Sequence, residues 1–258
     1  MRSFALLLLF SLTISVVISA NTTVDFSYSG PTGPLFWDTL PGSSEICRVG
    51  KHQSPIDISL EGFTNTGKCA DHKKEKVLKV KFHDAHNVEA TNTGNTVEIS
   101  KEGGLPANLT LKSGKYELAQ FHFHTPSEHR VGGVHSDVEA HFVFKTKEAN
   151  PKISVVAVFY NVGKEENKFL KPIIETLPLK EKESKDIDFI KLSSVLSDIN
   201  FLDGAYTYSG SLTTPPCTEG VTWWVSKPAQ TLSSCQFHSL REVTGFNSRF
   251  TQLRSDVC

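Results

Sequence analysis

The sequence has no marked excess of charge of either sign. Its 27 Lys and Arg residues are balanced by 28 Asp and Glu residues, giving a formal net charge of −1. A protein that binds nucleic acid presents a basic surface to the phosphates, so this composition argues against a nucleic-acid partner. The Lys-rich stretches Lys73–Lys76 and Lys180–Lys185 mix both signs, which is typical of solvated loops and helix ends.

The sequence also lacks internal repeats and any long Pro- or Ser-rich linker, and we therefore expect a single domain. Beyond the first twenty residues it has no apolar run long enough to span a bilayer. The C-terminus carries no hydrophobic tail of the kind that directs lipid anchoring. These features predict a protein without a stable membrane anchor.

The first twenty residues have the pattern of an export signal. Arg2 supplies a positive charge, Phe4–Phe10 is an unbroken apolar run, and Ile18–Ala20 ends in small residues suited to cleavage. A membrane anchor is the alternative, but Ser11 and Ser15 interrupt the segment before it reaches spanning length. We predict cleavage after Ala20 and a secreted, extracellular domain of residues 21–258, a length suited to one mainly β domain.

Strand patterns dominate the rest of the chain, and helical patterns are few. Ile153–Phe159 is almost continuously apolar and predicts a strand buried on both faces. The predicted strands, rich in β-branched or aromatic residues, are Val77–Phe82, Thr96–Ile99, Leu109–Leu111, Leu118–His124, Val138–Phe144, Ile153–Tyr160 and Val221–Val225. The predicted helical pieces are part of Glu165–Thr176, a short turn near Ser194–Ile199, and Ser234–Val243. We therefore expect a mainly β domain with a few short surface helices.

Two of these strands carry histidines in a pattern that points to a metal. Alternate side chains of a strand share a face, so His122 and His124 point the same way, while Phe121 and Phe123 face the packed side. A neighbouring strand that brings His141 alongside completes a set of three imidazoles. Three His ligands with one open position are typical of a catalytic zinc site. The alternative is an ordinary amphipathic strand with polar histidines.

Two further residues strengthen the metal interpretation. A metal-bound His needs an acceptor for its other ring nitrogen. Gln120 lies two residues before His122, and Glu139 lies two before His141, each on the ligand face. We therefore predict that these two side chains support the ligands.

The sequence resembles the alpha-class carbonic anhydrases from about Tyr28 to the end of the chain. The motifs that match, in order, are Gly33-Pro34 with Trp37, Gln53–Asp57, Gln120–His124, Ser127–His129, Glu139–His141, Ser211–Pro216 and Gly220–Trp223. Phe246–Phe250 resembles microbial, fungal-type members of that family more than animal ones. The resemblance implies a large, central, twisted and mostly antiparallel mixed sheet, with cis peptide bonds before Pro55 and Pro216.

The resemblance also implies a reaction, the reversible hydration of carbon dioxide to bicarbonate and a proton by zinc-bound hydroxide. In that family a threonine at the position of Thr213 orients the hydroxide and donates to a glutamate at the position of Glu128, and Thr214 helps to hold bicarbonate. His129 matches a structural histidine packed behind that glutamate. The matches to the family's apolar substrate wall are Val143, Val155, Leu212, Val221 and Trp223.

One position departs from the family pattern. Where many members have a histidine that carries protons to buffer, this chain has Asn95, whose amide does not titrate near neutral pH. Tyr28 matches a tyrosine of the family's proton-transfer network. The remaining histidines have no assigned role: His52, His72, His83, His86, His135 and His238.

Five cysteines and two sequons bear on export. The resemblance implies a disulfide between Cys47 and Cys217; Cys69, Cys235 and Cys258 stay unassigned, and an odd total leaves at least one thiol unpaired or paired between chains. Asn21 and Asn108 begin Asn-x-Thr sequons, and we expect glycosylation at these sites in an exported protein.

Two other functions remain open. A carbonic-anhydrase-like storage or binding protein would fit the fold, although no residue of the expected ligand set is missing. A secreted metal-dependent hydrolase fits less well, because the His-Glu-x-x-His pattern that supplies a general base in such enzymes is absent. The oligomeric state is not indicated.

Overall fold

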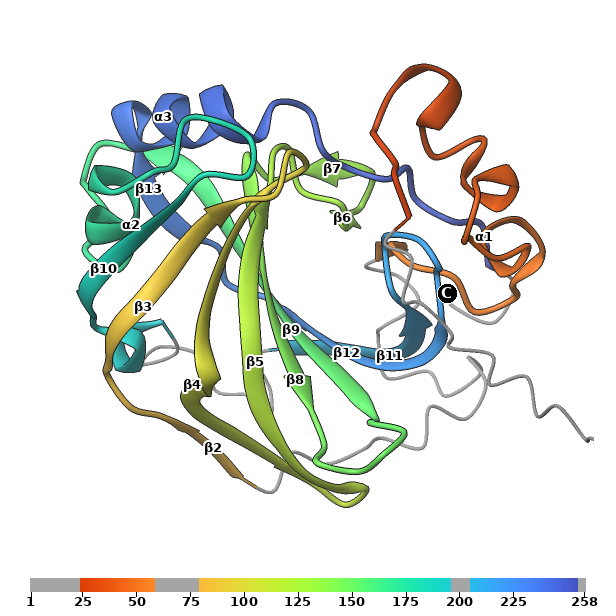
Figure 1. The fold of residues 1–258 in the computed structure, drawn as a ribbon, viewed down its shortest axis with the longest axis horizontal. Coiled ribbons are helices and arrows are strands. Elements are labelled where there is room, and N and C mark those ends of the chain that lie inside the picture. The colour runs from red at the N-terminus through yellow and green to blue at the C-terminus, as the bar shows by residue number, and fades with distance from the viewer. Residues whose placement is uncertain (1–23, 59–78, 196–204, 255–258) are drawn as a thin grey trace, which may run out of the picture.

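The structure is a computed structural model that describes residues 24–58, 79–195 and 205–254. The predicted signal segment, Asn21, Cys69, His72 and Cys258 lie outside these residues. Figure 1 shows one large twisted sheet, with helices α2 (Lys171–Glu175) and α3 (Ser234–Thr244) at one end and the N-terminal segment at the other. Within the described residues, no helix has the length and apolar character needed to cross a membrane.

Within the described residues the large sheet has ten strands and is mixed, as expected. Its main path runs β10-β3-β4-β5-β8-β9-β12-β11, with β2 beside β4 and β13 beside β9. The pairs β12–β9 and β13–β9 are parallel and the others are antiparallel. The strands are β2 (Lys79–Phe82), β3 (Ala85–Asn92), β4 (Val97–Leu111), β5 (Gly114–His124), β8 (Val138–Lys145), β9 (Ile153–Gly163), β10 (Ser184–Ile190), β11 (Ala205–Ser211), β12 (Glu219–Ser226) and β13 (Gln230–Ser233).

The strand predictions are confirmed where the apolar pattern is strong. Strand β9 is buried over seven consecutive residues, as expected for a central strand. Thr96–Ile99 and Leu109–Leu111 were expected as two strands, but both lie in the single strand β4. Its register shifts between Ser100 and Leu105 and again before Asn108. Gly103 and Gly104 there have φ of 78° and 91°, a conformation that glycine adopts without steric cost.

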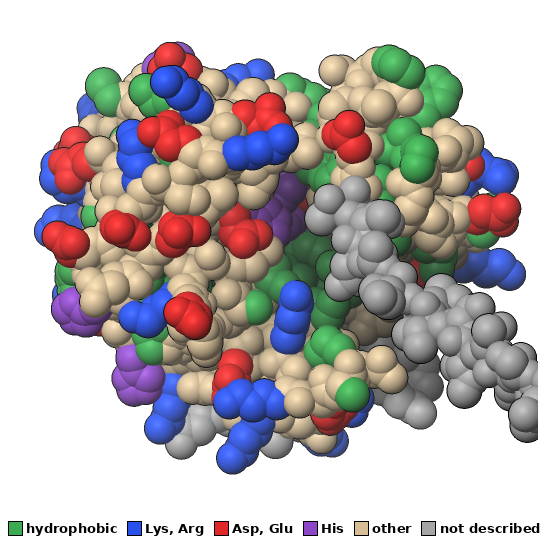
Figure 2. Space-filling view, in the orientation of Figure 1, with side chains coloured by type: hydrophobic (Ala, Val, Ile, Leu, Met, Phe, Trp, Pro, Cys, Tyr) green, Lys and Arg blue, Asp and Glu red, His purple; other side chains and the backbone are tan. Residues whose placement is uncertain are grey.

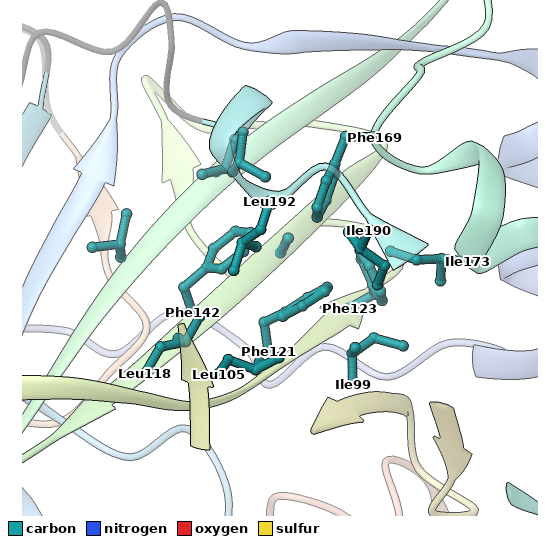
Figure 3. Packing of buried hydrophobic residues seen from close by; sticks show 14 of the residues in the cluster. Ile99, Leu105, Leu118, Phe121, Phe123, Phe142, Phe169, Ile173, Ile190 and Leu192 are labelled. Atoms are coloured by element: carbon teal, nitrogen blue, oxygen red, sulfur yellow. The ribbon is translucent and has the colours of Figure 1, made fainter. Parts of the chain in front are cut away.

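The two faces of the sheet bury separate apolar clusters. One cluster holds Phe121, Phe123 and Phe142 from β5 and β8, and Phe169 and Ile173 from the α2 region pack against them (Figure 3). Leu240 of α3 belongs to the same cluster. The other face carries a smaller cluster centred on β9 and β12. Because strand side chains alternate between faces, residues between the buried phenylalanines point to this second face.

Helices α2 and α3 form in the segments where the sequence predicts them. Within the predicted segment 165–176 only Lys171–Glu175 is α-helical, and it has a proline in its first turn, where the missing N–H costs no hydrogen bond. Helix α3 begins at a capping box in which Ser233 and Gln236 satisfy each other's backbone N–H groups. Near the predicted turn at 194–199 a 3₁₀ helix spans Leu192–Ser194, and residues 196–199 lie outside the described ranges.

A small second sheet and the N-terminal segment lie beside the large sheet. The small sheet has the order β1 (Asp57–Ile58), β6 (Arg130–Val131) and β7 (Val134–His135). Short helix α1 (Ile46–Val49) contains Cys47, which forms the expected disulfide with Cys217. The expected cis bonds before Pro55 and Pro216 are present, and a third precedes Pro126.

Candidate metal centre

The two histidine-bearing segments are adjacent antiparallel strands of the large sheet. In the β5–β8 pair His122 lies opposite His141, and His124 lies opposite Glu139. Directly opposite residues of two paired strands present their side chains on the same face, which brings the three imidazoles together. Phe121 and Phe123 are fully buried on the other face, as predicted. The sheet register therefore assembles the site.

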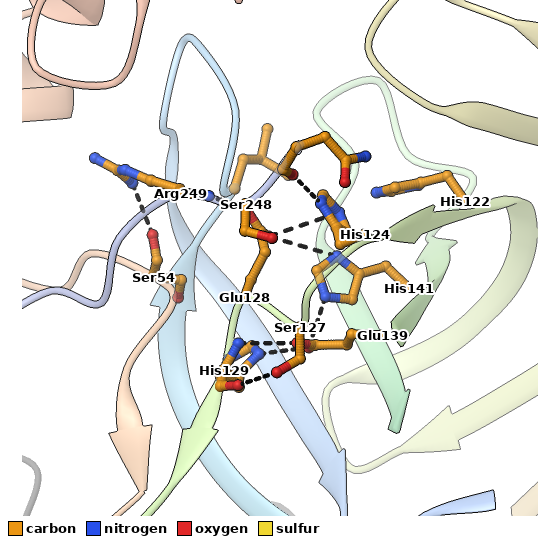
Figure 4. A network of polar contacts seen from close by, with 12 residues as sticks. Ser54, His122, His124, Ser127, Glu128, His129, Glu139, His141, Ser248 and Arg249 are labelled. Atoms are coloured by element: carbon orange, nitrogen blue, oxygen red, sulfur yellow. Dashed lines mark hydrogen bonds and ion pairs between the residues drawn. The ribbon is translucent and has the colours of Figure 1, made fainter. Parts of the chain in front are cut away.

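Each of the three imidazoles forms one hydrogen bond that fixes which ring nitrogen carries the proton. His122 Nδ1 donates to Gln120 Oε1 at 2.8 Å. His141 Nε2 donates to Glu139 Oε1 at 2.7 Å (Figure 4). His124 Nδ1 donates to the main-chain oxygen of Asn247 at 2.7 Å. Carbonyl and carboxylate oxygens only accept hydrogen bonds, so the other nitrogen of each ring keeps its lone pair.

Those three nitrogens, Nε2 of His122, Nε2 of His124 and Nδ1 of His141, are suited to one metal ion. One ring nitrogen from each residue lies within 4.8 Å of a nitrogen of the others. His124 Nε2 is buried and has no hydrogen-bond partner among the described atoms. A buried polar atom normally has a partner, and coordination to an ion would satisfy this nitrogen. Three neutral imidazoles are the donor set of an open zinc site.

The surroundings also favour the neutral imidazoles that bind metals. Burial lowers the pKa of His122 well below its ordinary value, and the neighbouring His124 and His141 lower it further. Burial likewise lowers the pKa of His124, although Glu128 opposes the shift. A metal competes with protons for these nitrogens, so a depressed pKa keeps the ligands available at neutral pH.

Glu139 connects the ligand His141 to a second buried histidine. Its carboxylate accepts from His129 Nδ1 at 2.6 Å and from the His129 backbone N–H at 2.8 Å. Burial alone would raise the pKa of Glu139, but His129 and His141 outweigh it and hold the pKa well below its usual range. His129 Nε2 also forms a hydrogen bond with the Tyr208 hydroxyl, at 2.6 Å. The expected structural histidine therefore forms two hydrogen bonds with Glu139.

No hydrogen bond joins Thr213 to Glu128 among the described residues, and the role of Thr213 stays a prediction. Glu128 Oε1 instead accepts from the Arg249 backbone N–H at 2.9 Å. This fixed donor turns Oε2 toward the ligands, 3.6 Å from His124 Nε2 and 3.9 Å from His141 Nδ1. Oε2 is buried without a hydrogen-bond partner.

Thr213 and Thr214 lie in the loop between β11 and β12, and Thr213 is buried. The Thr214 carbonyl accepts from the Cys217 N–H at 2.8 Å, and Cys217 is joined to Cys47. The disulfide therefore restrains the loop that carries both threonines.

The five residues predicted as an apolar wall fall in one cluster on the metal-ligand side of the sheet. Four of them are buried there, and Leu212 packs against the cluster half-buried. Trp223 lies edge-on to His141, with ring centroids 4.9 Å apart. The complete set is Val143, Val155, Leu212, Val221 and Trp223.

Asn95 and Tyr28 lie near each other on the N-terminal side of the site. Asn95 Nδ2 donates to the Phe26 main-chain oxygen at 3.0 Å. Tyr28 packs edge-on against Phe26 and Trp37. Burial and the charge of Glu128 raise the pKa of Tyr28 well above its usual value, so its hydroxyl stays protonated at neutral pH.

Sequence reasoning missed three residues around the centre. The Asn247 main chain holds His124, and its side-chain Nδ2 donates to the main-chain oxygens of Asn95 and Phe123. Arg249 holds Glu128 through its backbone. Glu98 lies opposite His122 in the β4–β5 pair, and burial raises the pKa of its carboxyl. Of these three, only Glu98 could have been found from the sequence. It stands between the apolar residues Val97 and Ile99 in a strand and so faces the side opposite to theirs.

None of the described unassigned histidines joins the three-histidine group. His52 forms a hydrogen bond with Arg254, and His135 forms hydrogen bonds with Ser127 and Arg130. The rings of His86 and His238 pack against Phe189 and Phe237, respectively. The His83 backbone N–H donates to the Pro106 carbonyl. Free Cys235 is exposed on α3.

Fold and site together define a class of protein: a large mixed sheet that carries, on one face, three histidines able to hold a metal ion. Comparisons with known proteins identify the family within this class. The family model of the eukaryotic-type carbonic anhydrases matches residues 32–256. A carbonic anhydrase of Nostoc sp. is 32% identical over 237 residues, covering 91% of this chain and 84% of that protein. One of Neisseria gonorrhoeae is 33% identical, covering 95% and 90%.

A solved structure agrees with these sequence matches. The alpha-carbonic anhydrase of Thermovibrio ammonificans, in complex with the inhibitor sulfanilamide, has a TM-score of 0.79 and 35% identity. The match covers 90% of this chain and 97% of that one. The chain belongs to the alpha carbonic anhydrase family and is an enzyme of that class.

Proposed function

We propose that this chain is an exported zinc enzyme that catalyses the reversible hydration of carbon dioxide to bicarbonate and a proton. The observation that carries the proposal is the set of three hydrogen bonds to Gln120, Glu139 and the Asn247 carbonyl. Together they leave one lone pair on each of His122, His124 and His141 toward a common point. A storage protein has no need for three ligands held in defined tautomers.

His122, His124 and His141 would hold the zinc ion. Zinc bound by three neutral imidazoles lowers the pKa of coordinated water to about 7 and so supplies a nucleophile at neutral pH; carbonic anhydrase is the standard example of this effect. Gln120, Glu139 and Asn247 keep the three rings in their ligating tautomers. Glu128 offers an unpartnered buried carboxylate oxygen beside two of the ligands, an acceptor for a hydroxyl group at this position.

Substrate placement follows from the polarity of the surroundings. Carbon dioxide is apolar, and the wall of Val143, Val221 and Trp223 on the ligand side of the sheet gives it an apolar surface. The Thr213 hydroxyl, held in a loop restrained by the Cys47–Cys217 disulfide, would orient the reacting oxygen. Thr214 would contact bicarbonate.

The proton that is released must reach bulk buffer. Asn95 occupies the position where a titrating side chain would be expected, and its amide donates to Phe26. Tyr28, with its raised pKa, remains protonated and serves to hold water. We infer that free buffer removes the proton in this enzyme.

Two features of the chain support export: a disulfide and an exposed glycosylation sequon. A disulfide such as Cys47–Cys217 persists in oxidising compartments. Asn108 is exposed on β4, where an attached glycan would face solvent. Mass spectrometry of the secreted protein tests both points, since we expect a chain beginning at Asn21 and a glycan on Asn108. A retained N-terminal segment would contradict cleavage.

The central test measures bound zinc together with stopped-flow hydration of carbon dioxide. We expect about one zinc ion per chain and hydration that is lost on chelation and regained on adding zinc. Stoichiometric zinc without hydration would favour the storage or binding protein. No zinc at all would reject the metal centre.

A further inference from the structure

A cavity lies between the N-terminal segment and the C-terminal segment that follows α3, and Tyr28 is part of its lining. It has a volume of about 320 Å³, in the range of small-molecule sites. Three segments form it: residues 28–36, the β6–β7 hairpin, and residues 246–250. In Figure 1 the red N-terminal segment faces β6 and β7, and the blue C-terminal segment passes between them. None of the three ligand histidines lines this cavity.

Its walls gather large apolar side chains that are unusually exposed. Leu35 is 74% exposed, Phe36 48%, Phe246 58% and Phe250 47%, and all four line the cavity. Figure 2 shows hydrophobic side chains grouped at this end of the molecule, at the upper right. Single exposed apolar residues are ordinary, but a group around one cavity is typical of a binding surface.

A fixed cation stands in the same cavity. Arg130 Nε donates to His135 Nε2 at 2.8 Å. His135 Nδ1 donates to the Ser127 carbonyl at 2.6 Å, which leaves Nε2 as an acceptor and orients the guanidinium. Among the described residues no carboxylate pairs with Arg130. Its terminal N–H groups are therefore free to form the two parallel hydrogen bonds by which arginine binds carboxylates.

A second guanidinium lies at the cavity, near the buried carboxylate of Glu128. Arg249 also lines it and is only 1% exposed. Its terminal nitrogens donate to Gln53 Oε1 and to the Ser54 and Cys47 carbonyls, all neutral acceptors. Its Nε is buried without a partner among the described atoms. A buried donor without a partner is costly, and an anionic ligand in the cavity would be attracted to this charge.

We propose that this cavity binds a small aromatic carboxylate, with its carboxylate on Arg130 and its ring against Phe36, Phe246 and Phe250. Aromatic rings pack favourably with one another at centroid separations of 4.5–7 Å. A purely apolar ligand would leave the oriented guanidinium unpaired. An inorganic anion would leave the aromatic walls exposed to water. The combination of both features selects the aromatic acid.

The test uses phenylacetate as probe with the zinc-loaded protein, followed by calorimetric titration and saturation-transfer NMR. For a ligand of this size we expect a Kd on the order of 1 mM. Phenylacetamide has the same shape without the charge and should bind on the order of 10-fold more weakly. This comparison needs no protein variant, so it holds even if a variant folds poorly.

Three variants locate the site. Arg130→Gln should weaken phenylacetate binding on the order of 10-fold, and Phe246→Ala should weaken it by a smaller factor. Arg241→Gln removes the same charge from an exposed position on α3 outside the cavity and should leave the Kd unchanged. No phenylacetate binding at about 10 mM, equal binding of the amide, or equal binding to wild type and Arg130→Gln would each overturn the proposal. The last of these results would place the bound acid elsewhere, such as at the zinc.

Discussion

The Asn247 main-chain oxygen accepts a hydrogen bond from His124 Nδ1 at 2.7 Å, although the two residues are 123 positions apart in the sequence. The same asparagine uses its side chain to bind the Thr125 N–H and the Asn95 and Phe123 carbonyls. The segment that follows α3 thus orients His124, one of the proposed metal ligands, on strand β5 and fixes the loop that carries Asn95.

This relationship predicts a stability effect that is separable from metal binding. Asn247→Ala leaves the main-chain carbonyl in place but removes the acceptor of the Thr125 N–H and the amide that donates to the Asn95 and Phe123 carbonyls. The Phe123 carbonyl keeps a second donor, Thr96 Oγ1. We expect the free energy of unfolding to fall by ~2–4 kcal/mol, measured by urea denaturation, with bound zinc largely retained. A variant as stable as wild type would show that water replaces the amide at no cost.

Removing one ligand should abolish the metal centre. In His141→Ala only two imidazoles remain, and we expect loss of most bound zinc and nearly all hydration, measured by elemental analysis and stopped flow. Glu139→Gln or Gln120→Ala should be milder, on the order of 10–100-fold in zinc affinity or activity. His238→Ala, on α3, is the matched control and should behave as wild type. Full zinc in His141→Ala would reject the ligand set.

Thr213 tests orientation of the reacting oxygen. Thr213→Ala should keep zinc but slow hydration on the order of 10²-fold, by analogy with loss of one positioned hydrogen-bonding group. Thr213→Ser retains the hydroxyl and should recover most of the rate. We also expect weaker sulfonamide binding in the alanine variant. If hydration were unchanged, Thr213 would be a turn residue only.

Asn95 predicts a limit on proton removal. In wild type kcat should rise steeply with imidazole-type buffer, while kcat/KM changes little, because proton release follows product formation. Asn95→His should raise kcat at low buffer, since a positioned carrier contributes ~10²–10⁴-fold to its step, and should flatten the buffer dependence. Asn95→Gln, which does not titrate, is the control. A wild-type kcat that is already high and insensitive to buffer would point to another carrier.

Glu98 predicts a pH dependence of stability. Burial raises the pKa of its carboxyl in the folded protein, with Lys145 acting in the opposite direction, so the folded state binds its proton more tightly than the unfolded chain. The ionised group therefore costs stability above the folded pKa, and this cost disappears as pH falls toward the unfolded value of about 4.3. Glu98→Gln should be more stable than wild type at pH 7, and the difference should shrink below pH 5. Parallel urea midpoints for both proteins from pH 4.5 to 8 would refute this.

The part of the site that the sequence predicts is the part encoded by side-chain alternation. The spacing of Gln120, His122 and His124, and of Glu139 and His141, is sufficient because a strand has a period of two. The partners of Glu128 and His124 were not predictable, since they are the main-chain N–H of Arg249 and carbonyl of Asn247, groups that every non-proline residue carries. Contact between distant main chains has no signature in residue type.

The same reasoning separates the strands that were predicted from those that were not. Strand β9 has an apolar run, whereas β10 reads Ser-Lys-Asp-Ile-Asp-Phe-Ile and β11 is rich in Ser and Tyr with a glycine. β10 and β11 lie at the two ends of the main strand order. Edge strands carry more polar residues, so their pairing with β3 and β12 depends on the rest of the sheet.

The dependence of His124 and Glu128 on residues 247–249 also sets an order of events during synthesis. The three metal ligands leave the ribosome long before Asn247 and Arg249, so a growing chain has the imidazoles but neither the carbonyl that fixes one tautomer nor the N–H that orients the carboxylate. Firm zinc retention would begin only when the late segment has docked. In the cell, tightly held metal would then mark chains that have finished folding.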